Sequence, residues 1–332
     1  LAQLNEWYLF PTLLASGTSP AAYPDVQSYI DALVAPARAQ SRDRYFTYIT
    51  SIAEENAYFN SGSTAGFGVR LSYDGVNRRL LVLEAYEGTP ALAAGIDRGT
   101  EILAIGTTTG NLKTVSSLFA SGGAAAVSDA LGPSDPGVTR VLQVRTGGTV
   151  STLSVAKANY SLDPVSTRYG AKVIDDGGRK VGYLNLRTFI STAEPGLREA
   201  FALFRSQGVT ELIVDLRYNG GGLVSIAELM GDLMNAQRPP AVFSYTTFRD
   251  SKAVYNETKP FAAQPQAIPV TRVAFIGTGA SASASELVIN AQTPYLGAAS
   301  ALIGSNTYGK PVGQIGIDQA ACDDRLRGVA FR

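Results

Sequence analysis

From about residue 170 onward, short apolar strands alternate with amphipathic helices, and this alternation restricts the fold more than any other feature. The segment ELIVDL at 211–216 is almost continuously apolar, as strands buried in a parallel sheet are. Before it, GLREAFALFRSQG at 196–208 has a helical apolar face, and LVSIAELMGDLM follows at 223–234. The pattern predicts an α/β domain over residues 170–332, with a parallel or mixed sheet and right-handed crossovers.

The rest of the chain divides into two further predicted parts. Residues 1–60 are expected to form a helical segment, because PDVQSYIDALV at 24–34 carries apolar residues at helical spacing behind Pro24 and Asp25. Residues 66–160 are expected to form a small β-rich domain. There FGVRLSYDG and RRLLVLEAY predict two strands joined by a turn, and three or so further short strands and two helices follow.

Composition excludes several classes of function. The 332 residues carry 28 basic and 28 acidic side chains, and a net charge of zero argues against a nucleic-acid binder or a basic membrane-surface protein. No apolar run approaches the roughly 20 residues of a membrane-spanning helix. The chain has no histidine and one cysteine, Cys322, so we expect no intrachain disulfide, no zinc site and no metal or organic cofactor.

Two loops follow predicted strands of the α/β domain, where functional sites of such sheets lie. The second loop leads into GTGASASASELV at 277–288. If a serine here is a nucleophile, a group other than histidine must remove its proton. Lys310, in SNTYGKPVGQ at 305–314, follows the next strand, and its apolar neighbours would lower its pKa. The glycine turn 220–222 and the start of the helix at Ala284 offer backbone N–H groups for an oxyanion.

Three motifs occur in the chain in this order: VDLRYNGGGLV, GASASASELV and SNTYGKPVGQ. Through these motifs the chain resembles the carboxy-terminal-processing, or tail-specific, serine peptidases. The resemblance covers about residues 66–317 and implies a core similar to the crotonase and ClpP-like folds. It implies a serine endopeptidase with a Ser-Lys dyad that hydrolyses polypeptides. By this resemblance Ser283 is the nucleophile and Lys310 is the base. Gln314 supports the lysine, and Glu286 is a neighbouring carboxylate. The oxyanion donors are the N–H groups of Ala284 and of Gly222 or else Gly221.

The β-rich part resembles a PDZ domain through GFGV at 66–69 and GTEILAIG at 99–106. This resemblance implies that Gly66, Phe67, Gly68 and Val69 present N–H groups to the C-terminal carboxylate of a peptide, which adds as a strand to the sheet edge. The family resemblance further implies a periplasmic or cell-envelope location in a bacterium, with a signal peptide removed. The oligomeric state stays open.

Structural explanations compete with these roles. Ser283 and Glu286 also have the spacing of a helix capping box. The glycines 220–222 also suit a plain strand-to-helix turn, Gln314 a plain strand residue and Lys310 a solvated surface lysine. GSNTYGK at 304–310 matches half of a phosphate-binding loop, but Pro311 replaces the required Ser or Thr. The main alternative function is a catalytically inactive peptide-binding scaffold.

Overall fold

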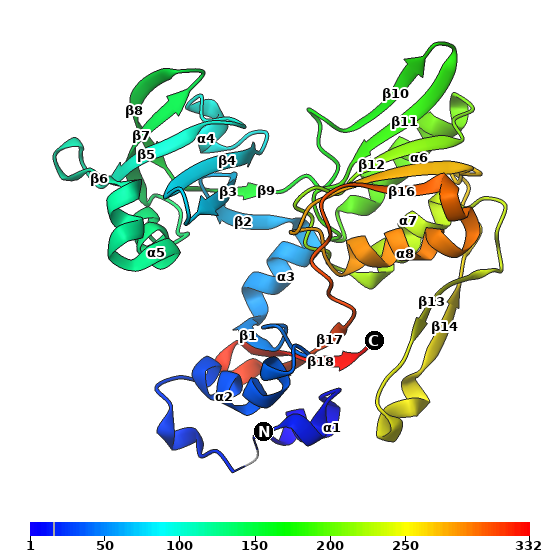
Figure 1. The fold of residues 1–332 in the computed structure, drawn as a ribbon, viewed down its shortest axis with the longest axis horizontal. Helices are drawn as coiled ribbons and strands as arrows, with labels where there is room; N and C mark the ends of the chain where they lie inside the picture. The colour runs from blue at the N-terminus through cyan, green and yellow to red at the C-terminus, as the bar shows by residue number, and fades with distance from the viewer. Residues whose placement is uncertain (16) are drawn as a thin grey trace. The chain divides into compact units, whose positions relative to one another are not determined.

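The chain folds into two compact units (Figure 1). The computed structural model describes residues 1–15 and 17–332. One unit consists of residues 1–60 and 164–332, and the other consists of residues 61–163. The sequence predicts residues 1–60 as a separate part. The structure differs here, because this segment packs into the same unit as the C-terminal region.

The larger unit is built on a five-stranded sheet in the order β10-β11-β12-β15-β16. All neighbours are parallel except β10, which pairs antiparallel with β11, so the sheet is mixed. The α/β class predicted for this region is confirmed. The strands are β10 (Ala171–Asp176), β11 (Arg179–Asn185), β12 (Glu211–Asp215), β15 (Arg272–Gly277) and β16 (Ser300–Gly304).

Three helices pack with this sheet around one buried apolar cluster. They are α6 (Ala193–Ser206), α7 (Val224–Met234) and α8 (Ala284–Leu296). On α6 the predicted apolar face is fully buried at Leu197, Phe201 and Phe204. Burial of these side chains fixes the helices against the sheet, because each large apolar side chain contributes about 1.5–3 kcal/mol when removed from water. The loops that leave the sheet therefore start from a rigid base.

The N-terminal segment joins this unit through a second sheet. Its elements are α1 (Ala2–Trp7), α2 (Val26–Ala39), β1 (Tyr48–Ser51) and α3 (Ile52–Ser61). Strand β1 pairs antiparallel with β18 (Asp324–Phe331), and β18 pairs with β17 (Gly313–Gln319). The helices agree with the sequence prediction, and Asp25 accepts the Ser28 N–H as the N-cap of α2. Strand β1 was not predicted, because its partner lies some 270 residues away in the chain.

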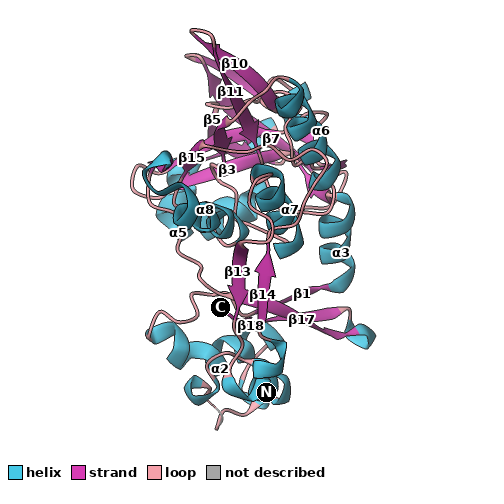
Figure 2. Ribbon diagram, turned by 90° about the vertical axis from the view of Figure 1, so that its right-hand side faces the viewer, coloured by secondary structure: helices cyan, strands magenta, loops and turns pink. Residues whose placement is uncertain are grey.

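A β-hairpin completes the larger unit. It consists of β13 (Val242–Thr246) and β14 (Glu257–Pro260), which pair antiparallel. Figure 2 shows the hairpin running from the region of α7 and α8 toward β18. Past β13, Phe248 forms an antiparallel bridge with Phe331 of β18. No helix among the described residues has both the length and the apolar composition needed to cross a bilayer.

The smaller unit has its own sheet and its own apolar core. The sheet order is β3-β4-β5-β7-β8, with β6 also pairing β5, and a separate pair joins β2 to β9. Strand β3 is therefore an edge strand. Helix α4 begins at Pro90 behind Thr89, as predicted. The elements are β2 (Ser63–Gly66), β3 (Val69–Asp74), β4 (Arg79–Ala85), α4 (Pro90–Ala93), β5 (Glu101–Gly106), β6 (Lys113–Thr114), α5 (Val115–Leu131), β7 (Thr139–Thr146), β8 (Thr149–Ala156) and β9 (Ala158–Ser161).

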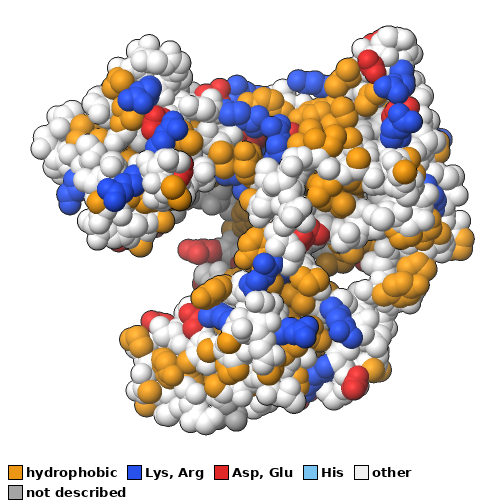
Figure 3. All heavy atoms as spheres, in the orientation of Figure 1, with side chains coloured by type: hydrophobic (Ala, Val, Ile, Leu, Met, Phe, Trp, Pro, Cys, Tyr) orange, Lys and Arg blue, Asp and Glu red, His pale blue; other side chains and the backbone are white. Residues whose placement is uncertain are grey.

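Charged side chains of both signs lie on the face drawn in Figure 3. On the face drawn in Figure 3, Lys and Arg side chains are dispersed among acidic, apolar and neutral groups and do not gather into one continuous basic stripe. This distribution agrees with the zero net charge of the chain.

Candidate active site

The loops after β12 and β15 meet at the carboxyl edge of the sheet. Asn219 in the first loop accepts two hydrogen bonds on its backbone oxygen, from Ala282 N at 3.0 Å and from Ser285 Oγ at 2.9 Å. Ser281 Oγ donates to Leu216 O at 2.6 Å. Ser281 and Ser285 are fully buried. Because their hydroxyls bond the backbone, the prediction that they are packing or turn residues is confirmed.

Ser283 lies between these two serines and differs from both. It is the N-cap residue of α8, it is only partly buried, and its backbone has φ 58° and ψ −115°. This conformation is unusual for a residue with a side chain, and such strain persists only where the surroundings enforce it. Ser283 and Glu286 do form a capping box. The capping-box explanation of the Ser283 and Glu286 spacing is therefore correct. A helix cap does not by itself require the positive φ of Ser283, however.

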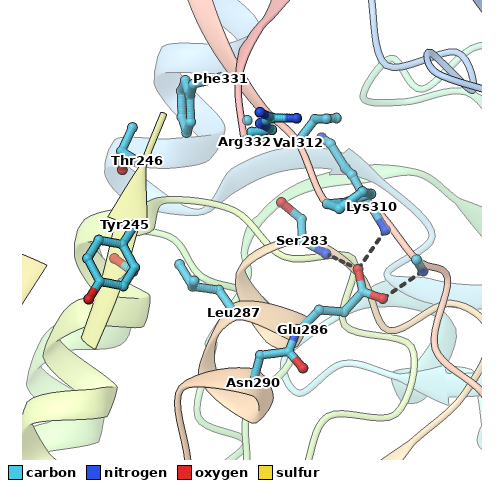
Figure 4. A pocket seen from close by; sticks show the side chains of 14 residues that line it. Tyr245, Thr246, Ser283, Glu286, Leu287, Asn290, Lys310, Val312, Phe331 and Arg332 are labelled. Carbon is cyan, nitrogen blue, oxygen red and sulfur yellow. Dashed lines mark hydrogen bonds between the residues drawn. The ribbon is translucent and has the colours of Figure 1, made fainter. Parts of the chain in front are cut away.

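Glu286 ties the serine to the lysine turn (Figure 4). Its carboxylate accepts hydrogen bonds from Ser283 N at 2.8 Å, Gly309 N at 2.6 Å and Lys310 N at 2.8 Å. Burial would raise the pKa of Glu286, but the hydrogen bonds from Thr307 and from these three N–H groups outweigh burial and lower the pKa. Glu286 therefore stays ionised and holds two turns together.

The Lys310 amine is held in largely apolar surroundings. Its Nζ donates to Gln314 Oε1 at 2.5 Å and lies 5.0 Å from the centroid of the Phe46 ring. Burial lowers the pKa of Lys310 to about 8. The charge of Arg327 acts in the same direction, while Asp43 and Glu286 oppose it. About a tenth of this amine is therefore unprotonated at pH 7 and able to accept a proton, far more than for a lysine in water.

Ser283 and Lys310 line the same pocket, which has a volume of about 350 Å³. Its walls come from β13, the first turns of α8, residues 309–313 and the end of β18. Most of the surface is apolar, and Leu287, Val312 and Phe331 contribute to it. Within the part of the chain that the structure describes, Ser283 Oγ and Lys310 Nζ are not joined by a hydrogen bond, and the Nζ donates to Gln314. Such contacts often tighten only when substrate is bound.

The glycine loop lies directly against Ser283. A Cβ built on Gly221 would stand 2.7 Å from Ser283 Cβ and 2.9 Å from Ala284 N. The Gly221 N–H donates to Asn219 Oδ1 at 2.9 Å. By contrast, the N–H groups of Gly222 and Ala284 have no hydrogen-bond acceptor within residues 1–15 and 17–332.

Gly221→Ala is expected to disrupt this arrangement. The new methyl group would meet backbone atoms closer than 3 Å, and the φ of +98° disfavours any side chain. We expect a loss of about 1–3 kcal/mol in stability and a much larger loss of activity. Thermal melts and initial rates measure the two. Gly220→Ala is the matched control, since nothing lies within 4 Å of its built Cβ. Equal activity of both variants would contradict the placement of Gly221 at the serine.

Several residues of this site were not found from the sequence. Asn219 could have been, because an Asn before a glycine turn commonly bonds its own loop. Its Nδ2 donates to Leu186 O at 2.9 Å, and the residue is fully buried. Asp43, Arg44 and Phe46 carried no signal in the sequence. They come from the N-terminal segment, which is held near the lysine turn by the pairing of β1 with β18 and by an apolar cluster that joins Phe46 to Val312 and Val329.

In the smaller unit, the predicted peptide-binding residues form the connection between β2 and β3. Phe67 is buried in the unit's core, and its carbonyl accepts the Ala91 N–H. The Gly68 carbonyl accepts hydrogen bonds from Tyr86 N and Thr89 Oγ1. Gly66 pairs with Ala158, and Val69 begins edge strand β3.

The geometry speaks against a nucleotide site at residues 304–310. The N–H groups of Gly309 and Lys310, which would face phosphate in such a loop, both donate to Glu286. Residues 305–312 do not enter a helix. Among residues 1–15 and 17–332, no group of three or more His, Cys, Asp or Glu side chains is arranged to hold a metal ion.

With this geometry in view, comparison with known proteins gives a consistent result. Residues 180–326 match the model of peptidase family S41. The matched segment contains Ser283, Glu286, Lys310, Gln314 and the glycine loop. The match agrees with the part of the chain that the resemblance to carboxy-terminal-processing peptidases assigned to catalysis.

Individual proteins extend the S41 similarity beyond that segment. The chain is 30% identical over 279 residues to carboxyl-terminal-processing peptidase 1, chloroplastic, of Arabidopsis thaliana, an alignment that covers 81% of this chain and 51% of that protein. It is 28% identical to a carboxyl-terminal-processing protease of Picosynechococcus, covering 75% of this chain and 55% of that protein. The chain thus spans about half the length of the curated relatives it matches.

A solved structure supports the fold. A Bacteroides fragilis protein assigned to the S41 proteases superposes with a TM-score of 0.72 and 24% sequence identity, covering 100% of this chain and 84% of that one. At this identity the likeness concerns the fold alone. It extends the similarity to both compact units and agrees with the mixed α/β architecture.

Proposed function

We propose that the chain is a serine endopeptidase that hydrolyses polypeptides with a Ser283–Lys310 dyad. The observation that carries this proposal is the pocket that Ser283 and Lys310 line together, with the amine desolvated and its pKa lowered to about 8. The S41 match over residues 180–326 supports it. The core, similar to the crotonase and ClpP-like folds, is proposed on the same resemblance as the dyad.

In the acylation step, Ser283 Oγ attacks the carbonyl carbon of the scissile peptide bond. The neutral Lys310 amine accepts the hydroxyl proton, as a histidine does in other serine peptidases. Gln314 keeps the amine in place through the 2.5 Å hydrogen bond. The C–N bond then breaks, and Lys310 returns the proton to the leaving amine. A water molecule hydrolyses the acyl-enzyme by the same proton route.

The negative charge of the tetrahedral intermediate is stabilised by backbone donors. We assign this role to the N–H groups of Ala284 and Gly222, with Gly221 shaping the loop beside them. The N-terminus of α8 adds the favourable end of a helix dipole. Glu286 does not carry a proton in this scheme, because three backbone N–H groups and Thr307 keep it ionised. It positions the serine and the lysine relative to one another.

Labelling with a fluorophosphonate probe tests the dyad. The proposal expects a covalent adduct on Ser283, identified by mass spectrometry of peptides, that forms faster as pH rises. The alternative of an inactive scaffold expects no adduct, and it is not favoured by the relatives named above. An adduct that persists in Ser283→Ala, or that forms undiminished in Lys310→Ala, would rule out the dyad.

We further propose that the smaller unit is PDZ-like and binds the C-terminus of the substrate. Strand β3 is an edge strand and offers a place for a peptide to add as a further strand. The loop before it has the N–H groups of Phe67 and Gly68 without an acceptor among the described residues, whereas both carbonyls are bonded. Gly68 has a φ of +79°, and a Cβ there would stand 2.1 Å from Thr89 Cβ. The loop backbone thus supports a carboxylate site.

Peptide amidation tests this second part. A fluorescent peptide with a free C-terminus is expected to bind the Ser283→Ala chain at least about tenfold more tightly than its C-terminal amide, because a charged hydrogen bond contributes about 1.5–3 kcal/mol. Fluorescence anisotropy measures both affinities, and the serine variant prevents cleavage. Equal affinities would show that a terminal carboxylate is not recognised, without bearing on the dyad.

The location we propose is the periplasm or cell envelope of a bacterium. This rests on the resemblance to carboxy-terminal-processing peptidases. Fractionation of cells that produce the natural full-length protein, followed by immunoblotting of periplasmic, membrane and cytoplasmic fractions, tests it. Recovery in the cytoplasmic fraction would contradict it.

A further inference from the structure

The turn that carries Lys310 is held from two sides, and only one side belongs to the matched S41 segment. Glu286 accepts the N–H groups of Gly309 and Lys310, as described above. On the other side, Arg44 Nη2 donates to Tyr308 O at 2.7 Å and also to Gly309 O. One carboxylate and one guanidinium therefore bond the N–H and C=O groups of the same turn.

A neighbouring residue of the N-terminal segment reaches the amine. The Phe46 ring lies beneath Lys310 Nζ, with 5.0 Å between the nitrogen and the ring centroid. The Phe46 backbone oxygen accepts a hydrogen bond from Gln314 Nε2. Because Gln314 Oε1 accepts from Lys310 Nζ, the carbonyl of Phe46 fixes which end of the Gln314 amide faces the lysine.

The loop of residues 43–47 is itself rigid. Asp43 is fully buried and accepts hydrogen bonds from Phe46 N at 2.8 Å, Thr47 N at 3.2 Å, Thr47 Oγ1 at 2.5 Å and Tyr8 Oη at 2.8 Å. Four donors on one buried carboxylate leave the loop little freedom. The loop leads directly into β1, whose partner β18 pairs with the strand that carries Gln314.

We propose that the loop of residues 43–47 is a positioning element of the catalytic base, in which Arg44 holds the turn that carries Lys310 and Phe46 holds its amine and Gln314. This inference rests on the proposed function, since it assigns residues that act through Lys310. It assigns to the N-terminal segment a part in the reaction: without the loop, the lysine turn keeps its anchor on Glu286 but loses its anchor on the carbonyls and the cover over the amine.

The charged and titratable groups around the amine define how the loop acts. Asp43 from the loop, Glu286 from α8 and Arg327 from β18 all face Lys310. The Tyr48 hydroxyl from β1 bonds Gln314. None of these is removed when Phe46 is replaced. A change in the pH dependence of a Phe46 variant therefore reports the exposure of the amine to water and not the loss of a charge.

Variants at position 44 test the hydrogen bonds from Arg44 to the carbonyls of the lysine turn. Arg44→Ala is expected to lower the rate constant of Ser283 acylation by a fluorophosphonate about tenfold or more. Arg44→Lys should recover only part of this rate, because an ammonium does not reproduce the planar fork that bonds two carbonyls. Arg42→Ala is the matched control, since Arg42 lies exposed directly before this loop. A rate constant is measured per folded molecule, so loss of folded protein lowers the amplitude alone.

Variants at position 46 test the cover over the amine. Phe46→Ala is expected to admit water and to move the midpoint of the acylation rate against pH upward by roughly half a unit to one unit. Phe46→Leu keeps the amine dry and should restore the midpoint of the unsubstituted chain. A residue with only a structural role would change the yield of folded protein but not this midpoint.

Two sets of outcomes separate this inference from the proposed function. If Ser283→Ala and Lys310→Ala abolish labelling while Arg44→Ala matches Arg42→Ala and the Phe46 midpoints coincide, the loop has no positioning role and the dyad stands. If labelling does not depend on Ser283 or Lys310, both proposals fail. Slower acylation in Arg44→Ala together with a raised midpoint in Phe46→Ala supports the loop as a positioning element.

Discussion

Ser283→Ala is expected to reduce hydrolysis of an unfolded, dye-labelled protein substrate by about 10⁴-fold or more. In the proposed mechanism the variant removes the attacking oxygen, and the two neighbouring serines are not placed to replace it. Ser281 Oγ and Ser285 Oγ are buried and donate to backbone carbonyls. The residual rate would come from substrate binding and from the backbone donors alone. Initial rates of dye release, together with a thermal melt, measure activity and folding separately.

The control for this variant is Ser305→Ala. Ser305 lies exposed just past β16 and does not line the pocket, and its hydroxyl donates to the Asn306 carbonyl. Its activity should equal that of the unsubstituted chain within about twofold. If Ser283→Ala kept more than a few per cent of the activity, the nucleophile would have to be sought elsewhere in the molecule.

The second large effect is the dependence of the rate on pH. In the proposed mechanism only the neutral Lys310 amine accepts the serine proton, and the pKa of this amine is lowered to about 8. The value of kcat/KM should therefore rise with pH, with a midpoint near 8. Below that pH the neutral fraction falls about tenfold per unit, so we expect about a hundredfold lower rate at pH 6 than above pH 9. A stopped assay over pH 5.5–10 in buffers of constant ionic strength measures this profile.

Substitution of the lysine completes this test. Lys310→Arg should be inactive across the whole range, since a guanidinium stays protonated. In Lys310→Ala the rise of kcat/KM with a midpoint near pH 8 should disappear. Part of the lost rate should return when a small primary amine is added to the buffer. Lys172→Ala, at an exposed lysine in β10, is expected to keep the original profile. A profile of Lys310→Ala with the same midpoint would assign that ionisation to another group.

Much of the candidate site could be predicted because its residues are local in the sequence. The SASE run lies in the turn where β15 leads into α8, and the capping spacing places Glu286 one helical turn from Ser283. The position of Lys310 followed from a simple rule, because parallel neighbouring strands end at the same edge of a sheet. The structure agrees, since Tyr308 N in the lysine turn donates to Ser281 O at 2.9 Å.

The N-terminal contribution could not be predicted in this way. Helix propensity described α2 and α3, but the placement of Arg44 and Phe46 depends on contacts with residues more than 260 positions away. Such pairing leaves no periodic pattern at either end. For the same reason no local pattern indicates that pairing of β1 with β18 joins the two ends of the chain in one compact unit.

The sequence by itself determined the α/β class of the larger unit, the β-rich smaller unit, and the serine, glycine and lysine turns with their order. These features depend on hydrophobic periodicity and on turn chemistry, which act over a few residues. Only the tertiary structure decided the strained backbone of Ser283, the N–H groups of Gly222 and Ala284 that lack an acceptor among the described residues, and the surroundings that lower the pKa of Lys310. Those properties arise from burial and from hydrogen bonds between distant segments, which exist only after the chain has folded.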